Sequence, residues 1–272
     1  MSDLLRLVRA HNLLIAAAGV LAGGWIALGR IATPPSLWWA ALAAIGLGAA
    51  GNTLNDIADA AADRLNRPER PMAAGRVRRG AAELVVFFGA LGGLAAAGLV
   101  GGTQVVAGLA ALAVMAAYSP WLKPRGLPGN LAVALIGGLP LFYGALAVGT
   151  ARAGMVPWAL AAWLHLMREI VKDVEDEAGD RVIGRRTLPI VVGSRRAEVV
   201  AAGVGLLFVP ASLLLPYRTG FGPPYFLIAL PVQMAVLVAA TWLILGRVAR
   251  VSALLKTSMV VGLAALVAGR VA

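Results

Sequence analysis

Residues 36–63 read SLWWAALAAIGLGAAGNTLNDIADAAAD, an uncharged apolar run that ends in a group of carboxylates. A membrane span needs roughly 20 apolar residues to cross about 30 Å of hydrocarbon, and the run from 36 to 54 meets that need. In a helix that continues past the run, Asn55, Asp59 and Asp63 recur at every fourth position and so lie on one face. The stretch therefore predicts a membrane helix with a stripe of oxygen-bearing side chains at its end.

The chain as a whole has the composition of a membrane protein. Of its 272 residues, 60% are hydrophobic, and the mean hydropathy is +0.83, which is more than a soluble domain needs. Apolar runs recur along the whole length, so we expect one transmembrane domain over residues 1–272. The absence of cysteine excludes disulfides, thiolate metal sites and cysteine nucleophiles.

Nine apolar segments divide the sequence, with Gly, Pro and Ala frequent inside them, as close packing of membrane helices favours. They cover approximately residues 11–29, 36–54, 81–100, 103–121, 128–149, 155–172, 197–216, 223–245 and 251–270. We therefore expect an all-α membrane protein with nine transmembrane helices.

The basic residues gather on one side of this nine-helix path. The other side holds only Arg30, Arg152, Arg218 and Arg270. Because short cytoplasmic loops are enriched in Lys and Arg, we expect the N-terminus and the loops after the second and sixth helices to be cytoplasmic in a multi-pass protein of the cell membrane. The same rule explains the net charge of +11, so we do not expect nucleic acid as a partner.

A second acidic motif follows the sixth apolar segment. It reads KDVEDEAGD over residues 172–180, and Asp173, Asp176 and Asp180 stand at helical positions i, i+3 and i+7, which predicts a second helical stripe of carboxylates. Nine of the thirteen acidic residues lie in the stretches 56–63 and 169–180, at helix ends on the cytoplasmic side. Carboxylates beside a membrane domain are costly unless they face water, cations or one another, so both stretches are candidate functional sites.

The two motifs suit a divalent cation and a phosphate ligand. Mg²⁺ prefers oxygen ligands and commonly joins a few carboxylates to substrate phosphates, and it assists the departure of a diphosphate by neutralising the developing charge. A cation-coupled transporter would place its carboxylates near the middle of the membrane, and a scaffold gives no reason for the spacing to recur. The helix-end position beside arginine-rich loops favours a phosphate ligand over a transported cation.

The motifs NDxxDxxxD at 55–63 and DxxDxxxD at 173–180 resemble those of the UbiA superfamily of intramembrane prenyltransferases. The resemblance extends over nearly the whole chain. It implies helices around a central cavity, a prenyl chamber open to the bilayer, and a Mg²⁺ and prenyl diphosphate site beneath cytoplasmic cap loops after helices 2 and 6. The metal ligands that it implies are Asn55, Asp59, Asp63, Asp173, Asp176 and Asp180.

The resemblance also implies further site roles. Asp59, Asp176, Lys123 and Tyr118 are expected to be the catalytic residues. The expected contacts of the diphosphate are Asn55, Arg9, Arg67, Arg70, Lys123 and Lys172. The enrichment of cytoplasmic loops in Lys and Arg explains each of the arginines equally well. The enrichment of Tyr at the membrane interface explains Tyr118 without a catalytic role.

Two stretches point to the acceptor. Residues 168–180 with Thr187-Leu188-Pro189, and Asn66-Arg67-Pro68 after the first motif, look like the archaeal-type branch that forms digeranylgeranylglyceryl phosphate. The implied reaction transfers a geranylgeranyl group to the hydroxyl of geranylgeranylglyceryl phosphate, a step of archaeal-type ether lipid synthesis. Aromatic acceptors such as homogentisate or 4-hydroxybenzoate, and chlorophyllide, remain alternatives. The 4-hydroxybenzoate branch fits less well, because its second motif usually has adjacent aspartates where this chain has Gly179-Asp180.

Overall fold

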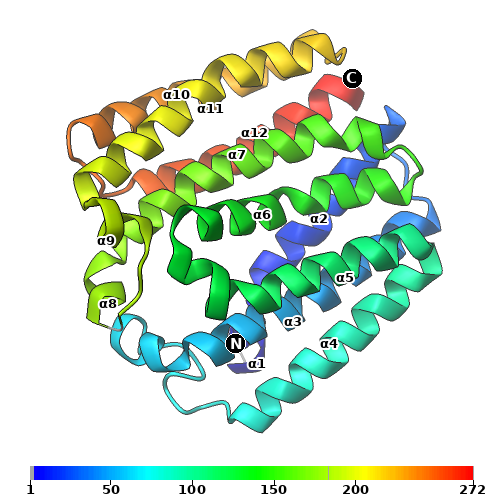
Figure 1. The fold of residues 1–272 in the computed structure, drawn as a ribbon. Helices are drawn as coiled ribbons and strands as arrows, with labels where there is room; N and C mark the ends of the chain where they lie inside the picture. Colours follow the sequence, from blue (N-terminus) through cyan, green and yellow to red (C-terminus); the bar gives the residue numbers. More distant parts are fainter. Residues whose placement is uncertain (1–2, 183, 272) are drawn as a thin grey trace.

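The computed structural model describes residues 3–182 and 184–271, which form helices and short connections without a strand (Figure 1). The π-helical turn η1 (Tyr118–Leu122) and the 3-10 turn η2 (Lys123–Arg125) join α5 to α6. The α-helices are α1 (Asp3–Leu7), α2 (Ala10–Leu28), α3 (Pro35–Asn66), α4 (Arg79–Val100), α5 (Gly102–Ala117), α6 (Leu127–Ala147), α7 (Ala151–Glu175), α8 (Glu177–Val182), α9 (Leu188–Val192), α10 (Ser194–Arg218), α11 (Pro223–Ile244) and α12 (Val251–Val271).

Each predicted apolar segment coincides with a long helix of the described chain. Eight of these helices are long and apolar enough to cross a membrane, namely α2, α3, α4, α5 with its following turns, α6, α10, α11 and α12. The remaining long helix, α7, is more polar and carries Arg168, Glu169 and Lys172 in its second half. The all-helical class and the multi-pass membrane character are therefore confirmed.

The outer surface of the bundle is apolar. α4 exposes Phe87, Phe88 and Leu91, and α11 exposes Leu227 and Leu230. Within a helix every backbone polar group is satisfied internally, so such a surface is compatible with hydrocarbon. Lipid is the natural solvent for these side chains.

The long helices form a ring. Each helix contacts the next one in the order α2, α3, α5, α6, α7, α10, α11 and α12, and α12 contacts α2 again. α4 packs against α3 and α5 and lies at the edge of the bundle in Figure 1. This arrangement leaves an interior space that most of the helices can line.

Close packing between α2 and α6 narrows one end of the ring. A Cβ atom on Gly144 would lie 1.8 Å from the carbonyl oxygen of Val20, and one on Gly23 would lie 2.0 Å from that of Leu141. Small residues let membrane helices approach to backbone contact. These positions fall in the second halves of both helices, so the ring closes at the end away from the acidic motifs.

The connections after α3 and α7 lie together at the other end of the ring. Figure 1 shows α8 and α9 at the same end as the connection 67–78, and α12 terminates at the opposite end. Leu7, Val77 and Ala82 form a small buried cluster, against which Met72 and Ile57 pack. This cluster holds α1 and the connection 67–78 against α3, beside the first acidic motif.

Candidate functional site

A cavity of about 1150 Å³ lies inside the ring. Its walls come from α2, α3, α5, α6, α7, α10, α11 and α12. Carboxylates and basic side chains line the end near the acidic motifs, whereas Leu141, Leu160, Phe208, Val232 and Leu266 line the interior. The cavity therefore offers a charged entrance and an apolar body.

The first acidic motif lies inside α3, which continues to Asn66. Asp56, Asp59 and Asp63 are 2%, 3% and 6% exposed, and all of them line the cavity. Asn55 also lines it, and its Oδ1 accepts a hydrogen bond from Ser119 Oγ at 2.8 Å. The predicted residues Asn55, Asp59 and Asp63 do share the cavity wall, and Asp56, which the helical spacing did not select, joins them.

The prediction of a continuous helical stripe for the second motif is wrong. α7 ends at Glu175, Asp176 adopts a non-helical conformation (φ −93°, ψ 1°), and α8 begins at Glu177. Closely spaced carboxylates repel one another in a helix, so a break in this run has a physical cause. Asp180 is consequently carried on α8.

The break separates the environments of the second-motif carboxylates. Asp176 and Asp180 line the cavity. Asp173 instead accepts a hydrogen bond at 2.7 Å from Nδ2 of the buried Asn130 on α6. Burial raises the pKa of Asp173 to about 6, despite the hydrogen bond from Asn130, which lowers it.

Basic side chains join the two motifs. Arg185, in the connection after α8, donates to Oδ1 of Asp59 at 2.5 Å and to Oδ1 of Asp180 at 3.0 Å. Arg67, which follows α3, donates to Oδ2 of Asp176 at 3.0 Å. Arg67 follows the first motif and contacts the second, and Arg185 contacts both motifs. The two motifs therefore meet at one charged end of the cavity.

The first motif also has basic partners of its own. Lys123 Nζ lies 2.9 Å from Oδ2 of Asp59, and Arg70 donates to Oδ2 of Asp63 at 2.6 Å. The pKa of Asp63 is nevertheless raised, because burial and the nearby carboxylates outweigh the opposing effect of Arg70. An added cation would relieve this cost.

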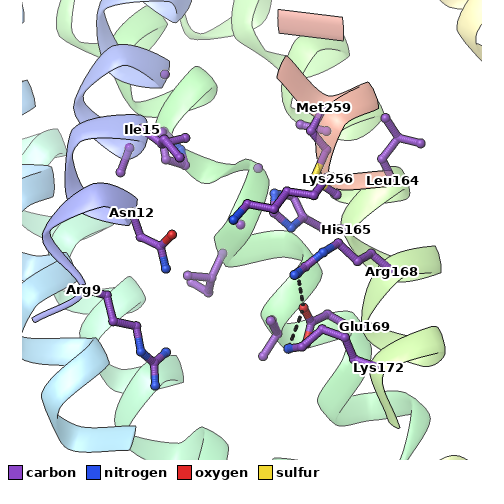
Figure 2. Close-up of a pocket in the computed structure, with 18 of the residues that line it drawn as sticks. Arg9, Asn12, Ile15, Leu164, His165, Arg168, Glu169, Lys172, Lys256 and Met259 are labelled. Atoms are coloured by element: carbon purple, nitrogen blue, oxygen red, sulfur yellow. Dashed lines mark hydrogen bonds and ion pairs between the residues drawn. The ribbon is translucent and has the colours of Figure 1, made fainter. Parts of the chain in front are cut away.

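Arg9 reaches the first motif from a strained turn. It stands between α1 and α2 in the left-handed region (φ 55°, ψ 56°), which is uncommon for residues other than glycine. Its guanidinium donates to Oδ1 of Asp56, and Figure 2 shows it below Asn12 on the wall formed by α2. The turn thus directs a cation toward the carboxylates.

Tyr118 and Lys123 enter the cavity from an irregular segment. The predicted apolar segment extends to 121, but α5 ends at Ala117 and the π-helical turn η1 follows. Pro120 lies in this turn and cannot donate a backbone hydrogen bond. Tyr118 and Lys123 both line the cavity, as the proposed site requires.

Lys172 has a different partner from the one that its predicted role suggests. It lines the cavity, but its Nζ donates to Oε2 of Glu169 at 3.0 Å. Arg168 donates to Oε1 of the same carboxylate at 3.1 Å, and Figure 2 shows the three side chains together on α7. Lys172 therefore belongs to a charged group on α7 that precedes the second motif.

The carboxylates do not form a ready-made cage for an ion. Within residues 3–182 and 184–271, no three His, Asp or Glu side chains are grouped so as to hold a metal. Mg²⁺ commonly takes only one or two carboxylates, together with substrate phosphates and water. A donor set of separate carboxylates around a cavity fits that mode, in which the substrate completes the coordination.

Sequence reasoning missed several cavity residues. Nothing in the sequence distinguishes Arg185 from the other arginines of its loop. Asp56 was not selected because only one helical face of the first motif was considered. Arg168 was noted only as the first residue of the stretch 168–180, without a site role of its own. Lys256 had a visible signal, because it is a lone charge inside the apolar segment 251–270.

Comparison with known proteins accounts for this combination of fold and motifs. The profile described as the UbiA prenyltransferase family matches residues 16–262. The chain belongs to the UbiA prenyltransferase family. It is accordingly a prenyltransferase, as the resemblance of the two acidic motifs predicted.

Similar UbiA proteins extend over nearly all of the chain. The digeranylgeranylglyceryl phosphate synthase of Halobacterium salinarum is 38% identical over 98% of this chain and 96% of that protein. A solved structure of a digeranylgeranylglyceryl phosphate synthase has a TM-score of 0.82 and 25% identity, and covers 99% of this chain and 98% of its own. A UbiA homologue from Archaeoglobus fulgidus, solved with GPP and Mg²⁺, shares the fold with a TM-score of 0.64 and 16% identity, covering 98% of both chains.

Proposed function

We propose that this chain transfers a geranylgeranyl group from geranylgeranyl diphosphate to the free hydroxyl of geranylgeranylglyceryl phosphate. The observation that carries the proposal is the cavity, which has two arginine-bridged acidic motifs at one end and apolar walls beyond them. A substrate with a charged diphosphate head and a long hydrocarbon tail has a charged part and an apolar part that match these two regions of the cavity. The similarity to digeranylgeranylglyceryl phosphate synthases supports this choice of acceptor.

The proposed arrangement in the membrane is a single domain of nine spans. It counts the polar helix α7 together with the eight apolar helices, since α7 lies between α6 and α10 in the ring. In this count α3 is the second span and α7 the sixth, so an alternating path places the N-terminus and the connections after these two helices on one side. The excess of arginine there supports the cytoplasmic side, where these connections would cap the site.

The motif end would hold Mg²⁺ through Asp59, Asp63, Asp176 and Asp180, with Asn55 and Asp173 beside them. When bound there, Mg²⁺ supplies charge neutralisation for the departing diphosphate. The donor set fits because these are oxygen ligands at a cavity wall and because Asp63 is destabilised as a buried anion. The same ion is present in the structure of the Archaeoglobus fulgidus homologue.

The basic side chains at this end would bind the diphosphate. Arg9, Arg67, Arg70, Lys123 and Arg185 each contact a motif carboxylate. Because these contacts are charge-assisted hydrogen bonds, the same donors suit phosphate oxygens equally well. The entering diphosphate would therefore meet, on the cavity wall, donors that can also bind its oxygens.

In the reaction, the bond between the allylic carbon and the diphosphate oxygen breaks. The acceptor hydroxyl oxygen forms the new ether bond, and its proton passes to the released diphosphate. The cationic side chains stabilise the negative charge on the leaving group. Tyr118 lines the cavity, where it would help to position the reacting carbon. The apolar walls exclude water, which would otherwise capture the allylic cation.

A competition experiment tests the choice of acceptor. Purified protein receives labelled geranylgeranyl diphosphate and Mg²⁺ together with equal amounts of geranylgeranylglyceryl phosphate, homogentisate and 4-hydroxybenzoate. We expect the label in the diether phosphate. Label in an aromatic product would keep the prenyltransferase chemistry and refute the proposed acceptor.

A further inference from the structure

A second charged group lies on the cavity wall formed by α7 and α12. It comprises Arg168, Glu169 and Lys172 on α7 and Lys256 on α12, and all four side chains line the cavity. α7 and α12 contact each other. In Figure 2, Lys256 extends into the cavity on the side of Arg168, with the apolar Met259 and Leu164 above it. We call these four residues the α7–α12 cation group.

The α7 members of this group share a single carboxylate. Glu169 is 8% exposed, and it accepts hydrogen bonds from both Arg168 and Lys172. The Nε atom of Arg168 is buried without a hydrogen-bond partner. A buried donor that lacks an acceptor costs about 1–3 kcal/mol of stability. A further anion that accepts from this guanidinium would remove that cost.

Lys256 adds a cation from the opposite helix. Within the described residues it makes no ion pair or hydrogen bond with a carboxylate. It lies one turn inside an apolar helix of spanning length, where a charged residue is costly and commonly marks a site of function. Three cations and one carboxylate leave this wall of the cavity positively charged.

We propose that the α7–α12 cation group binds the phosphate monoester of the lipid acceptor. A phosphate monoester carries about −1.5 to −2 charges at pH 7 and three strong acceptor oxygens. This charge matches the excess of cations over carboxylate in the group, and its oxygens can accept from Arg168 Nε and Lys256 Nζ. The inference rests on the proposed function, since only a phosphorylated acceptor needs such a subsite.

The location of the group suits the geometry of that acceptor. In geranylgeranylglyceryl phosphate the reacting hydroxyl and the phosphate belong to one three-carbon glycerol unit. The phosphate must therefore lie near the leaving diphosphate and yet be bound separately from it. Lys172 of the group directly precedes the second motif, whereas Arg168 and Lys256 are contacts distinct from the bridges of Arg67 and Arg185.

Acceptor selectivity tests the proposal. The kcat/KM values for geranylgeranylglyceryl phosphate and for geranylgeranylglycerol, which lacks the phosphate, are measured for the wild type and for Lys256→Met. Lys256→Arg keeps the charge, and Arg168→Gln provides an independent variant if Lys256→Met does not fold. Arg247→Gln is the matched control, because Arg247 is an exposed cation near the same end of α12.

We expect the wild type to prefer the phosphorylated acceptor and Lys256→Met to reduce this preference about tenfold, as the loss of one charge-assisted hydrogen bond implies. The KM for geranylgeranyl diphosphate should stay within twofold, and Lys256→Arg should recover most of the preference. An unchanged preference in folded Lys256→Met and Arg168→Gln overturns the subsite alone. A wild type that uses neither glyceryl acceptor overturns the proposed function and the subsite with it.

Discussion

Arg185 donates to Asp59 on α3 and to Asp180 on α8, so one guanidinium bridges the two acidic motifs. The bridged carboxylates are 3% and 2% exposed. A buried pair of carboxylates would otherwise repel, and the shared cation lets them occupy one end of the cavity. In the proposed function, the same side chain also contacts the diphosphate.

Loss of this bridge should impair catalysis. We expect Arg185→Gln to lower kcat/KM for the prenyl diphosphate by about a hundredfold, which is the usual effect of removing one donor to a developing charge. Steady-state kinetics in detergent, at saturating acceptor, would measure the effect.

The neighbouring arginine provides the control for this prediction. Arg186 is exposed, and Arg186→Gln should keep kcat/KM within about twofold, since exposed surface charges contribute little. Equal kinetic losses in the two variants would mean that the loop needs positive charge in general, and the specific bridge would have no catalytic role.

The carboxylates of both motifs should be required for turnover. Asp59→Asn and Asp176→Asn each remove an anionic ligand while keeping the shape of the side chain, and we expect turnover to fall below detection with the protein still folded. Chelation by EDTA should abolish the wild-type activity, and Mg²⁺ should restore it. Product formation is followed by thin-layer chromatography of the labelled lipid.

Glu175→Gln is the matched control for Asp176→Asn, because Glu175 is the adjacent acidic residue and is exposed. We expect near wild-type turnover for it. Full activity in Asp59→Asn and Asp176→Asn would remove these residues from the metal site, and activity in EDTA would argue against a metal requirement.

The α2–α6 contact should be sensitive to a single methyl group. Gly144→Ala places a Cβ 1.8 Å from the carbonyl oxygen of Val20, and because backbone cannot move aside as a side chain can, the helices must separate. We expect destabilisation of about 1–3 kcal/mol, the usual range for overpacking, seen as a lower thermal midpoint in detergent.

A second glycine makes the comparison specific. Gly92 lies in α4, and a Cβ atom added there would meet nothing within 4 Å, so Gly92→Ala should keep or raise the midpoint by virtue of helix propensity. A similar fall of the midpoint in both variants would contradict the close-contact explanation, because an added methyl group at Gly92 meets no neighbouring atom.

The orientation in the membrane can be tested with single cysteines, because the chain has none of its own. Ala74→Cys lies in the connection after α3 and Thr150→Cys in the connection between α6 and α7, and both positions are exposed. In sealed spheroplasts we expect an impermeant maleimide to label Thr150→Cys and not Ala74→Cys. Labelling of Ala74→Cys alone would reverse the proposed orientation.

Much of the fold could be predicted from the apolar pattern, because hydrocarbon imposes length and composition on each span. The segment predicted at 81–100 corresponds to α4 (Arg79–Val100). Helix ends were predicted less accurately where the helix continues into polar residues. For example, the segment predicted at 155–172 corresponds to α7 (Ala151–Glu175). Hydropathy does not detect a helical turn that is charged.

The site was predictable in its carboxylates and less so in its cations. Asp59 and Asp176 were recognised because their spacing recurs in two motifs. The role of Arg185 depends on how the connection after α8 folds back over α3, which no local pattern encodes. Lys172 pairs with Glu169 three residues earlier, a local contact that its assignment to the diphosphate overlooked.

The most direct test of the proposed function is product formation by the purified wild-type protein. It would receive labelled geranylgeranyl diphosphate, geranylgeranylglyceryl phosphate and Mg²⁺, and the lipid product would be identified by mass spectrometry. We expect a diether phosphate that bears two geranylgeranyl groups and that does not form without Mg²⁺. Failure of a folded, Mg²⁺-supplied preparation to form that diether would contradict the proposed function.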